Sequence, residues 1–368
     1  MQEQKPLPLV SIIILNFNGK DYLEKCVSSV LETKYNNFEA ILVDNASTDD
    51  SLASIESSFG SDKRLRVIRN TKNLGFAGGN NIGFSYARGS YIAFLNNDTT
   101  VDPYWLTHLV DVLIKDKTVG LAQSLLLTGD GAEIDSGGFL LSEYLVGQHS
   151  IREKKIIHDF PYFEVSAATG AAMIVDRKIC GKMGLFDPLL PFYYDDVFIS
   201  LKTWLMGKRV VTVPNSIVYH AGSKATMAIA RDQQALIYFS IFHSMRAKIC
   251  LIIDTYYKFS DLIKGLFVLS FSLSELFLFG LLTKNRASVF AELCGLNWIL
   301  KNFGHIWYTR LLLWNRSKIS PQTLSAKFIR IRLPFSTYLL PAKKRNQYLF
   351  LAALKYERLL IDSLKESQ

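Results

Sequence analysis

The stretch Tyr91-Ile92-Ala93-Phe94-Leu95-Asn96-Asn97-Asp98 joins an apolar run to three polar residues, the last of which is a carboxylate. We interpret the run as a buried central strand that stops at Asp98. Ligands in open α/β sheets bind outside the carboxyl ends of the strands, so Asp98 is then expected at a binding cleft. The alternative is an Asn- and Asp-rich turn before a helix with Pro103 in its first turn. This stretch by itself is compatible with both.

The segments on either side favour the strand. Residues 10–15, 40–43 and 65–68 are short apolar runs, and helical segments are expected between them. This alternation predicts an α/β fold with a mostly parallel central sheet and helices on both faces. The pattern extends along an expected domain over residues 1–230. Its later elements are expected strands at 119–123, 167–175 and 210–219 and an expected helix at 195–207.

Charge is distributed unevenly along the 368 residues, which carry a formal net charge of +9. Between Lys301 and Arg345 there are ten Lys or Arg residues and no Asp or Glu. Such a segment predicts an anionic partner, and we expect acidic membrane lipids rather than nucleic acid. Four cysteines without a Cys-x-x-Cys motif are typical of a reducing compartment, and the first residues lack the pattern of a secretion signal. We therefore expect a cytoplasmic protein at the inner face of the cell membrane.

Residues 231–368 are expected to form a second region that is helical, apolar and basic. Within it, the segment 262–282 is long and apolar enough to span a bilayer, but Glu275 near its middle would be unfavourable there. A helix in the membrane surface, or a buried helix, fits at least as well. Aromatic residues typical of the headgroup region follow at Trp298, Trp307, Tyr308 and Trp314. We predict membrane attachment; the alternative is a soluble helical subdomain with a solvated basic face.

Polar residues follow the expected strands, whereas common hydrolase, dinucleotide and phosphate-loop motifs are absent from the sequence. Asp98 is a hard oxygen ligand for Mg²⁺ or Mn²⁺, and a nitrogen from His220 suits Mn²⁺ better. Such an ion neutralises the leaving group of a sugar nucleotide. A second carboxylate, in Asp195-Asp196, can take a proton from an acceptor hydroxyl.

Each of these residues also has a purely structural explanation. Asp44 can hydrogen-bond a turn with Ser47, and Asp195 or Asp196 can cap the helix that follows. A single histidine at a strand end is more often structural than a ligand. A cap needs only one carboxylate, so the adjacent pair favours catalysis.

Seven motifs follow one another along the expected domain. They are the segment 10–18, Val43-Asp44-Asn45-Ala46-Ser47-Thr48-Asp49, Asn73-Leu74-Gly75-Phe76-Ala77-Gly78-Gly79-Asn80, Leu95-Asn96-Asn97-Asp98, Thr169-Gly170-Ala171, Tyr193-Tyr194-Asp195-Asp196-Val197 and Val218-Tyr219-His220-Ala221-Gly222-Ser223. In this order they resemble the motifs of the family 2 glycosyltransferases of GT-A fold, and the most similar branch is the rhamnosyltransferase-like and galactofuranosyltransferase-like group. The resemblance covers about residues 8–223.

The resemblance implies a role for each matching residue. It implies that Asp98 and His220 bind the metal and that Asp196 is the catalytic base, with Asp195 beside it. Asp44 is implied to hydrogen-bond the base of the nucleotide. The full set implied at the nucleotide or donor is Asn16, Asn18, Asp44, Asn80, Asn96, Asn97, Thr169 and Gly170.

Two positions depart from the family pattern. The metal-binding Asp-x-Asp motif reads Asn96-Asn97-Asp98, so Asn96 can hydrogen-bond the donor but adds no charge. Asp195 replaces the common Glu, and adjacent carboxylates raise each other's proton affinity. The sequence therefore leaves open which of the two aspartates is the base.

The expected function is a metal-dependent inverting glycosyltransferase of cell-envelope glycan synthesis. Its donor is a nucleoside-diphosphate sugar, and its acceptor is a hydroxyl of a saccharide, lipid-linked at the cytoplasmic membrane face. The alternatives are a polyprenyl-phosphate sugar synthase, a nucleotidyltransferase and a non-catalytic membrane-binding module.

Overall fold

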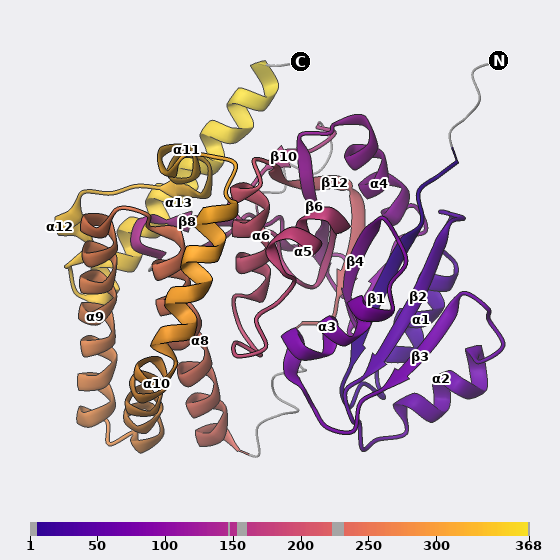
Figure 1. The fold of residues 1–368 in the computed structure, drawn as a ribbon, viewed down its shortest axis with the longest axis horizontal. Helices are drawn as coiled ribbons and strands as arrows, with labels where there is room; N and C mark the ends of the chain where they lie inside the picture. Colours follow the sequence, from indigo (N-terminus) through magenta and orange to yellow (C-terminus); the bar gives the residue numbers. More distant parts are fainter. Residues whose placement is uncertain (1–5, 146–147, 153–159, 223–231, 367–368) are drawn as a thin grey trace.

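The computed structural model describes residues 6–145, 148–152, 160–222 and 232–366 (Figure 1). A sheet flanked by helices occupies one side of the molecule, and a group of long helices from the last third of the chain occupies the other. The expected domain boundary at residue 230 falls in 223–231, outside the described residues, as does Ser223 of the last motif.

Four parallel strands form one half of the central sheet, in the order β3-β2-β1-β4. Successive side chains of a strand point to opposite faces, and Ile12, Ile13 and Ile14 are all fully buried because both faces are covered. The predicted parallel core is thus confirmed. Its strands are β1 (Val10–Asn16), β2 (Phe38–Asp44), β3 (Leu65–Arg69) and β4 (Tyr91–Asn96), and its helices are α1 (Leu23–Leu31), α2 (Ser51–Phe59) and α3 (Gly75–Tyr86).

The other half of the sheet is mixed. Strand β11 (Ala172–Asp176) lies between β4 and β6 (Val119–Thr128) and is antiparallel to both, while β12 (Arg209–His220) runs parallel to β6. Because β11 runs in the opposite direction, its first residues lie beside the carboxyl end of β4, where Asn96 N–H donates to the carbonyl of Ala171. The remaining elements here are β5 (Thr99–Val101), β7 (Ile134–Ser136), β10 (Phe163–Glu164), α4 (Trp105–Lys115), α5 (Arg177–Met183) and α6 (Asp195–Leu205).

The last third of the chain is mainly helical, as predicted. Two of its long helices begin at side-chain caps: Asp232 accepts a hydrogen bond from Ala235 N–H before α8, and Asn285 accepts one from Ser288 N–H before α10. Its elements are α8 (Gln233–Thr255), α9 (Phe259–Leu282), α10 (Arg286–Arg316), α11 (Pro321–Phe328), β13 (Ile329–Ile331), α12 (Phe335–Tyr338) and α13 (Ala342–Glu366).

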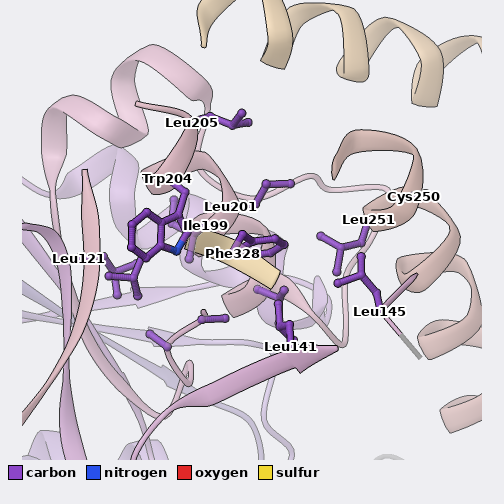
Figure 2. Packing of buried hydrophobic residues seen from close by; sticks show 14 of the residues in the cluster. Leu121, Leu141, Leu145, Ile199, Leu201, Trp204, Leu205, Cys250, Leu251 and Phe328 are labelled. Atoms are coloured by element: carbon purple, nitrogen blue, oxygen red, sulfur yellow. The ribbon is translucent and has the colours of Figure 1, made fainter. Parts of the chain in front are cut away.

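This helical region joins the sheet domain through a second, small sheet. Strand β13 pairs with β8 (Phe139–Ser142), which also pairs with β9 (Gln148–Ser150). A single hydrophobic cluster continues from the central sheet through α6 and into α8 and α11. Figure 2 shows this continuity, with Trp204 and Leu201 of α6 close to Phe328 of α11.

Two of the described helices, α8 and α9, are long and apolar enough to cross a bilayer. The carboxylate of Glu275, in the middle of α9, lies 2.9 Å from the guanidinium of Arg345 and accepts a hydrogen bond from Ala342 N–H at the start of α13. The charge that would be unfavourable in lipid is therefore paired within the protein.

Candidate active site

A cavity of about 600 Å³ lies at the carboxyl end of the central strands. The start of α6, the loop before β11 and the end of β12 all reach it, because the antiparallel strand and the parallel strands meet at this edge. Eight of the predicted site residues line it, namely Asn96, Asn97, Asp98, Thr169, Gly170, Asp195, Asp196 and His220.

Three predicted nucleotide-binding residues, Asn16, Asn18 and Asp44, do not line the cavity and bond to one another's loops instead. Asn16 Nδ2 donates to Asp44 Oδ1 over 3.0 Å, and Asn97 Nδ2 donates to Asn16 Oδ1 over 2.8 Å. Asn18 accepts a hydrogen bond from Thr48 N–H. These bonds connect the ends of β1, β2 and β4 and fix the loops that follow. Contact of Asp44 with a nucleotide base stays a prediction.

Asn80 is not brought to the cavity. It is buried on α3, and its side chain donates to the carbonyl of Phe76 in the same helix, 3.0 Å away. A role at the donor stays a prediction for this residue as well.

The expected metal ligands face each other across 3.4 Å. Asp98 Oδ1 and His220 Nε2 are both buried, and neither has a hydrogen-bond partner. The other ring nitrogen, Nδ1 of His220, donates to Asp135 Oδ2 over 2.8 Å, which turns the Nε2 atom towards Asp98. The two atoms form an ion pair when His220 is protonated, and a divalent cation that replaces this proton fits the same two atoms. A carboxylate oxygen and an imidazole nitrogen suit Mn²⁺.

The charges around His220 also favour a cation. Burial by itself lowers the pKa of an imidazole, but the hydrogen bond to Asp135 and the nearby Asp98 carboxylate outweigh burial and raise the pKa of His220 to about 9. Groups of three or more His, Cys, Asp or Glu side chains able to hold a metal are absent among the described residues. Binding of a metal by Asp98 and His220 stays a prediction, and the shell of such an ion would need donor phosphates and water as further ligands.

The two adjacent aspartates begin α6 and differ in environment. Asp196 is half-buried, and its oxygens accept hydrogen bonds from Gly170 N–H at 3.0 Å and Val197 N–H at 2.8 Å. Burial raises the pKa of Asp196 to about 6, against the effect of these two bonds. Burial, and then the charge of Asp196, raise the pKa of Asp195 well above its usual range. Asp196 is therefore the more readily ionised of the pair, as a general base near neutral pH requires.

The backbone before α6 is strained. Tyr193 and Tyr194 have φ values of 66° and 63°, in the left-handed region that residues other than Gly rarely adopt. This pair of left-handed residues directs the chain into α6. Strain of this kind is concentrated at functional sites.

The loop before β11 fits closely against the aspartates. Thr169 N–H donates to Gln123 Oε1 over 2.7 Å, which fixes the loop to β6. A Cβ atom at Gly170 would lie 3.2 Å from the ring of Phe76 and 3.6 Å from the Cβ of Asp196. The small residue predicted here therefore allows the loop to approach Asp196.

One wall of the cavity was not predicted from the sequence. It comes from α8, which contributes Phe239 and Ser244. The ring of Phe239 packs edge-on against Phe192 with centroids 4.8 Å apart, and the hydroxyl of Tyr193 hydrogen-bonds Ser240 Oγ over 2.9 Å. Asp135 was missed as well. Asp135 does not come after one of the expected buried strands, and a single carboxylate does not form a recognisable sequence motif.

Comparisons with known proteins agree with this geometry. Residues 11–184 match the family model described as Glycosyl transferase family 2. An uncharacterized glycosyltransferase of Haemophilus influenzae is 34% identical over 119 residues, which are 32% of this chain and 37% of that protein. The UDP-Glc:alpha-D-GlcNAc-diphosphoundecaprenol beta-1,3-glucosyltransferase WfaP of Escherichia coli is 41% identical over 101 residues, 27% of this chain and 38% of that protein. The chain thus spans less than two fifths of the length of either relative.

Solved structures show the fold. The mannosyltransferase PcManGT of Pyrobaculum calidifontis, in complex with GDP-Man and Mn²⁺, matches with a TM-score of 0.51 at 16% identity, over 95% of this chain and 87% of its own. S. aureus TarS 1-349 in complex with UDP-GlcNAc matches with a TM-score of 0.53 at 16% identity, over 98% of this chain and 92% of its own. The expected fold class is confirmed. The chain therefore has the GT-A fold, and its residues 11–184 match the family 2 glycosyltransferase model.

Proposed function

We propose that this protein is a metal-dependent inverting glycosyltransferase that moves a sugar from a nucleoside-diphosphate sugar to a hydroxyl of a saccharide acceptor. The observation that carries the proposal is one cavity containing both the unpartnered pair Asp98 and His220 and the half-buried carboxylate of Asp196. Asp98 and His220 could hold a cation that neutralises the charge of a leaving diphosphate, and Asp196 could remove a proton from the acceptor.

The chemistry needs a base on the acceptor side. Asp196 takes the proton of the acceptor hydroxyl while the oxygen of that hydroxyl forms a bond to the anomeric carbon of the donor. The bond between the anomeric carbon and the diphosphate breaks at the same time, and its electron pair stays on the phosphate oxygen. Asp98 and His220 would hold Mn²⁺ or Mg²⁺, which neutralises charge on the departing diphosphate. The N–H groups of Gly170 and Val197 keep Asp196 in one orientation.

The ligands of relatives and of proteins with the same fold support the proposed donor and acceptor classes. Solved structures that share the fold are complexes with UDP and GalNAc, GDP-Man or UDP-GlcNAc, and two contain Mn²⁺. The name of the relative WfaP specifies a diphosphoundecaprenol-linked acceptor. We propose by analogy a lipid-linked saccharide acceptor at the cytoplasmic face of the membrane, and a donor of the rhamnosyl or galactofuranosyl type implied by the motifs.

A ligand screen tests the proposal. The melting temperature of the purified protein is measured with a panel of sugar nucleotides, with Mn²⁺, Mg²⁺ or a chelator. A true donor stabilises the fold by mass action, by about 2.7 kcal/mol at a hundred times its Kd. Stabilisation should need the metal and should be lost in Asp98→Asn, while Asp187→Asn, at a carboxylate outside the cavity wall, serves as the matched control.

Turnover of the stabilising nucleotide completes the test. Release of nucleoside diphosphate and inversion at the anomeric carbon, followed by NMR, are the expected results. If every sugar nucleotide fails to stabilise the protein and none is turned over, the function is not the one proposed. Release of pyrophosphate would instead identify a nucleotidyltransferase.

A further inference from the structure

Large apolar side chains are exposed along α9 and α10, up to Leu300 at 77%, and they are most closely spaced at the turn that joins the two helices. Leu282, the last residue of α9, is 75% exposed, and Phe290, in the second turn of α10, is 60% exposed. Exposed groups of this kind mark interaction sites when they gather in one place. We name the following six residues the α9–α10 tip: Leu278, Phe279, Leu281, Leu282, Phe290 and Leu293.

The tip protrudes from the helices behind it. Successive residues of an α-helix lie about 100° apart, so the exposed side chains of Leu276, Leu278, Phe279 and Leu281 cover roughly 220° of the circumference of α9. A helix packed along a flat partner exposes one side only. Apolar side chains exposed around more than half of the circumference of α9 are typical of a helix end that inserts into an apolar environment.

The tip is also preformed. Gly280 packs so closely on α10 that a Cβ atom there would lie 3.0 Å from the side chain of Val289, and Asn285 caps α10 through Ser288 N–H. Little conformational entropy is then lost when the tip binds a partner.

The charge around the tip is positive. Lys284 and Arg286, both exposed, lie in the turn itself. Residues 276–294, which form the tip and its flanks, contain these two basic residues and one acidic residue, Glu292. Glu292 is 3% exposed, and burial raises its pKa to about 7. An anionic lipid surface complements this charge, whereas a symmetric contact with a second copy would place the positive turns against each other.

The part of α9 beyond its contact with α13 is long enough to insert into a membrane surface but too short to span a bilayer. Helix α13 is bound to α9 at Glu275, so only the residues from there to Leu282 extend beyond it. Seven residues rise about 10 Å. This agrees with the depth of roughly 5–10 Å that interfacial helices reach and is far less than the ~30 Å of a bilayer core.

The tip lies next to the cavity. Tyr238 of α8 stacks on Phe290 of the tip with ring centroids 5.8 Å apart, and the next residue, Phe239, lines the cavity. Figure 1 shows the turn between α9 and α10 at the same end of the molecule as the start of α8.

We propose that the α9–α10 tip inserts into the surface of an anionic phospholipid bilayer without crossing it. The biological role of this insertion rests on the proposed function. With the tip inserted, the cavity opens beside the bilayer, and a saccharide acceptor whose lipid anchor stays in the membrane can reach it.

Vesicle flotation of the full-length protein tests the inference without donor, metal or acceptor. The vesicles contain phosphatidylglycerol and phosphatidylcholine in equal parts, or phosphatidylcholine alone. The tip variant is Leu281→Asp/Leu282→Asp. The matched control is Leu351→Asp/Leu359→Asp on α13, where the side chains are 54% and 56% exposed. Melting temperatures show that both variants are folded.

The wild-type protein should float with the mixed vesicles, and the tip variant should bind them about tenfold or more weakly, while the control binds like the wild type. Lys284→Glu should weaken binding by about fivefold or more, since each basic residue near an anionic surface contributes about 1 kcal/mol. Equal binding by the tip variant and the wild type refutes the proposal. A dimer that the tip variant dissociates, with no vesicle binding, also refutes it and assigns the tip to a second copy. Neither result affects the glycosyltransferase proposal, which soluble donor turnover tests separately.

Discussion

Replacing Asp196 by Asn is expected to abolish transfer and, at neutral pH, to stabilise the fold. A positioned general base contributes roughly 10²- to 10⁴-fold to a rate, so kcat should fall by that factor. The wild-type kcat/KM should fall tenfold per pH unit below about pH 6, because the free enzyme loses its base as Asp196 is protonated.

The gain in stability follows from the same pKa. Burial raises it from 3.8 to about 6, which at about 1.4 kcal/mol per unit makes the ionised carboxylate unfavourable by about 3 kcal/mol in the folded state. Because the folded pKa is the higher one, this penalty is absent below about pH 4 and complete above about pH 6. An Asn amide leaves one of the two N–H donors, Gly170 or Val197, without an acceptor, at roughly 1–2 kcal/mol. The net gain is about 1–2 kcal/mol at high pH, with a net loss at low pH.

Melting temperatures of the two proteins at about pH 4 and about pH 8 measure this difference, which should change sign. The variant should melt roughly 2–4 °C higher at the upper pH. Asp195→Asn is the matched control and should stabilise the fold without the same loss of rate. If the stability of Asp196→Asn relative to the wild type is the same at both pH values, burial does not raise the pKa of Asp196. A variant that keeps most of its activity would refute the role as base and favour a lipid phosphate acceptor, which needs little base.

Three further substitutions examine the metal site and the helical region. Asp98→Ala should abolish metal-dependent turnover and leave the melting temperature of the metal-free protein nearly unchanged; a fully active variant would make this segment an ordinary turn. Asp135→Asn should weaken Mn²⁺ binding by about 10- to 100-fold by freeing the ring of His220, measured by calorimetric titration, and unaltered affinity would contradict this role. Glu275→Gln should destabilise the protein by about 1–3 kcal/mol by leaving the buried Arg345 unpaired, and an unchanged midpoint of urea unfolding would argue against it.

Local patterns were enough to predict the parallel strands β1 to β4 and most of the cavity. The expectation of a mostly parallel sheet was wrong for the other half, where β11 is antiparallel to both of its neighbours. The strand that ends before Asp98 is buried because its apolar residues face covered sides of the sheet, and the direction of each parallel strand follows from the helix before it. Residues at the ends of such strands must meet at one edge. Asp98 and His220 could therefore be placed in one cavity from the sequence, whereas Asp196, at the start of α6, was assigned to it through the family resemblance.

Contacts between distant segments could not be predicted in this way. No periodicity indicates that α8 closes the cavity with Phe239, because an apolar helix has the same pattern whatever it packs against. For Asn80, the local contact is the one that the family motif did not predict. The side chain of an Asn in a helix can hydrogen-bond the backbone of the preceding turn, and Asn80 does so with the carbonyl of Phe76.

The pairing of β13 with β8 has a consequence for biosynthesis. Ile329 lies beside Leu141, which precedes it by 188 residues, so β8 gains this neighbour only after residue 329 has left the ribosome. Domains generally fold from the amino terminus as synthesis proceeds, and here the wall of the cavity made by α8 is synthesised after the central sheet. A stalled chain that ends before α8 lacks that wall. Completion of the site therefore waits for synthesis of the helical region.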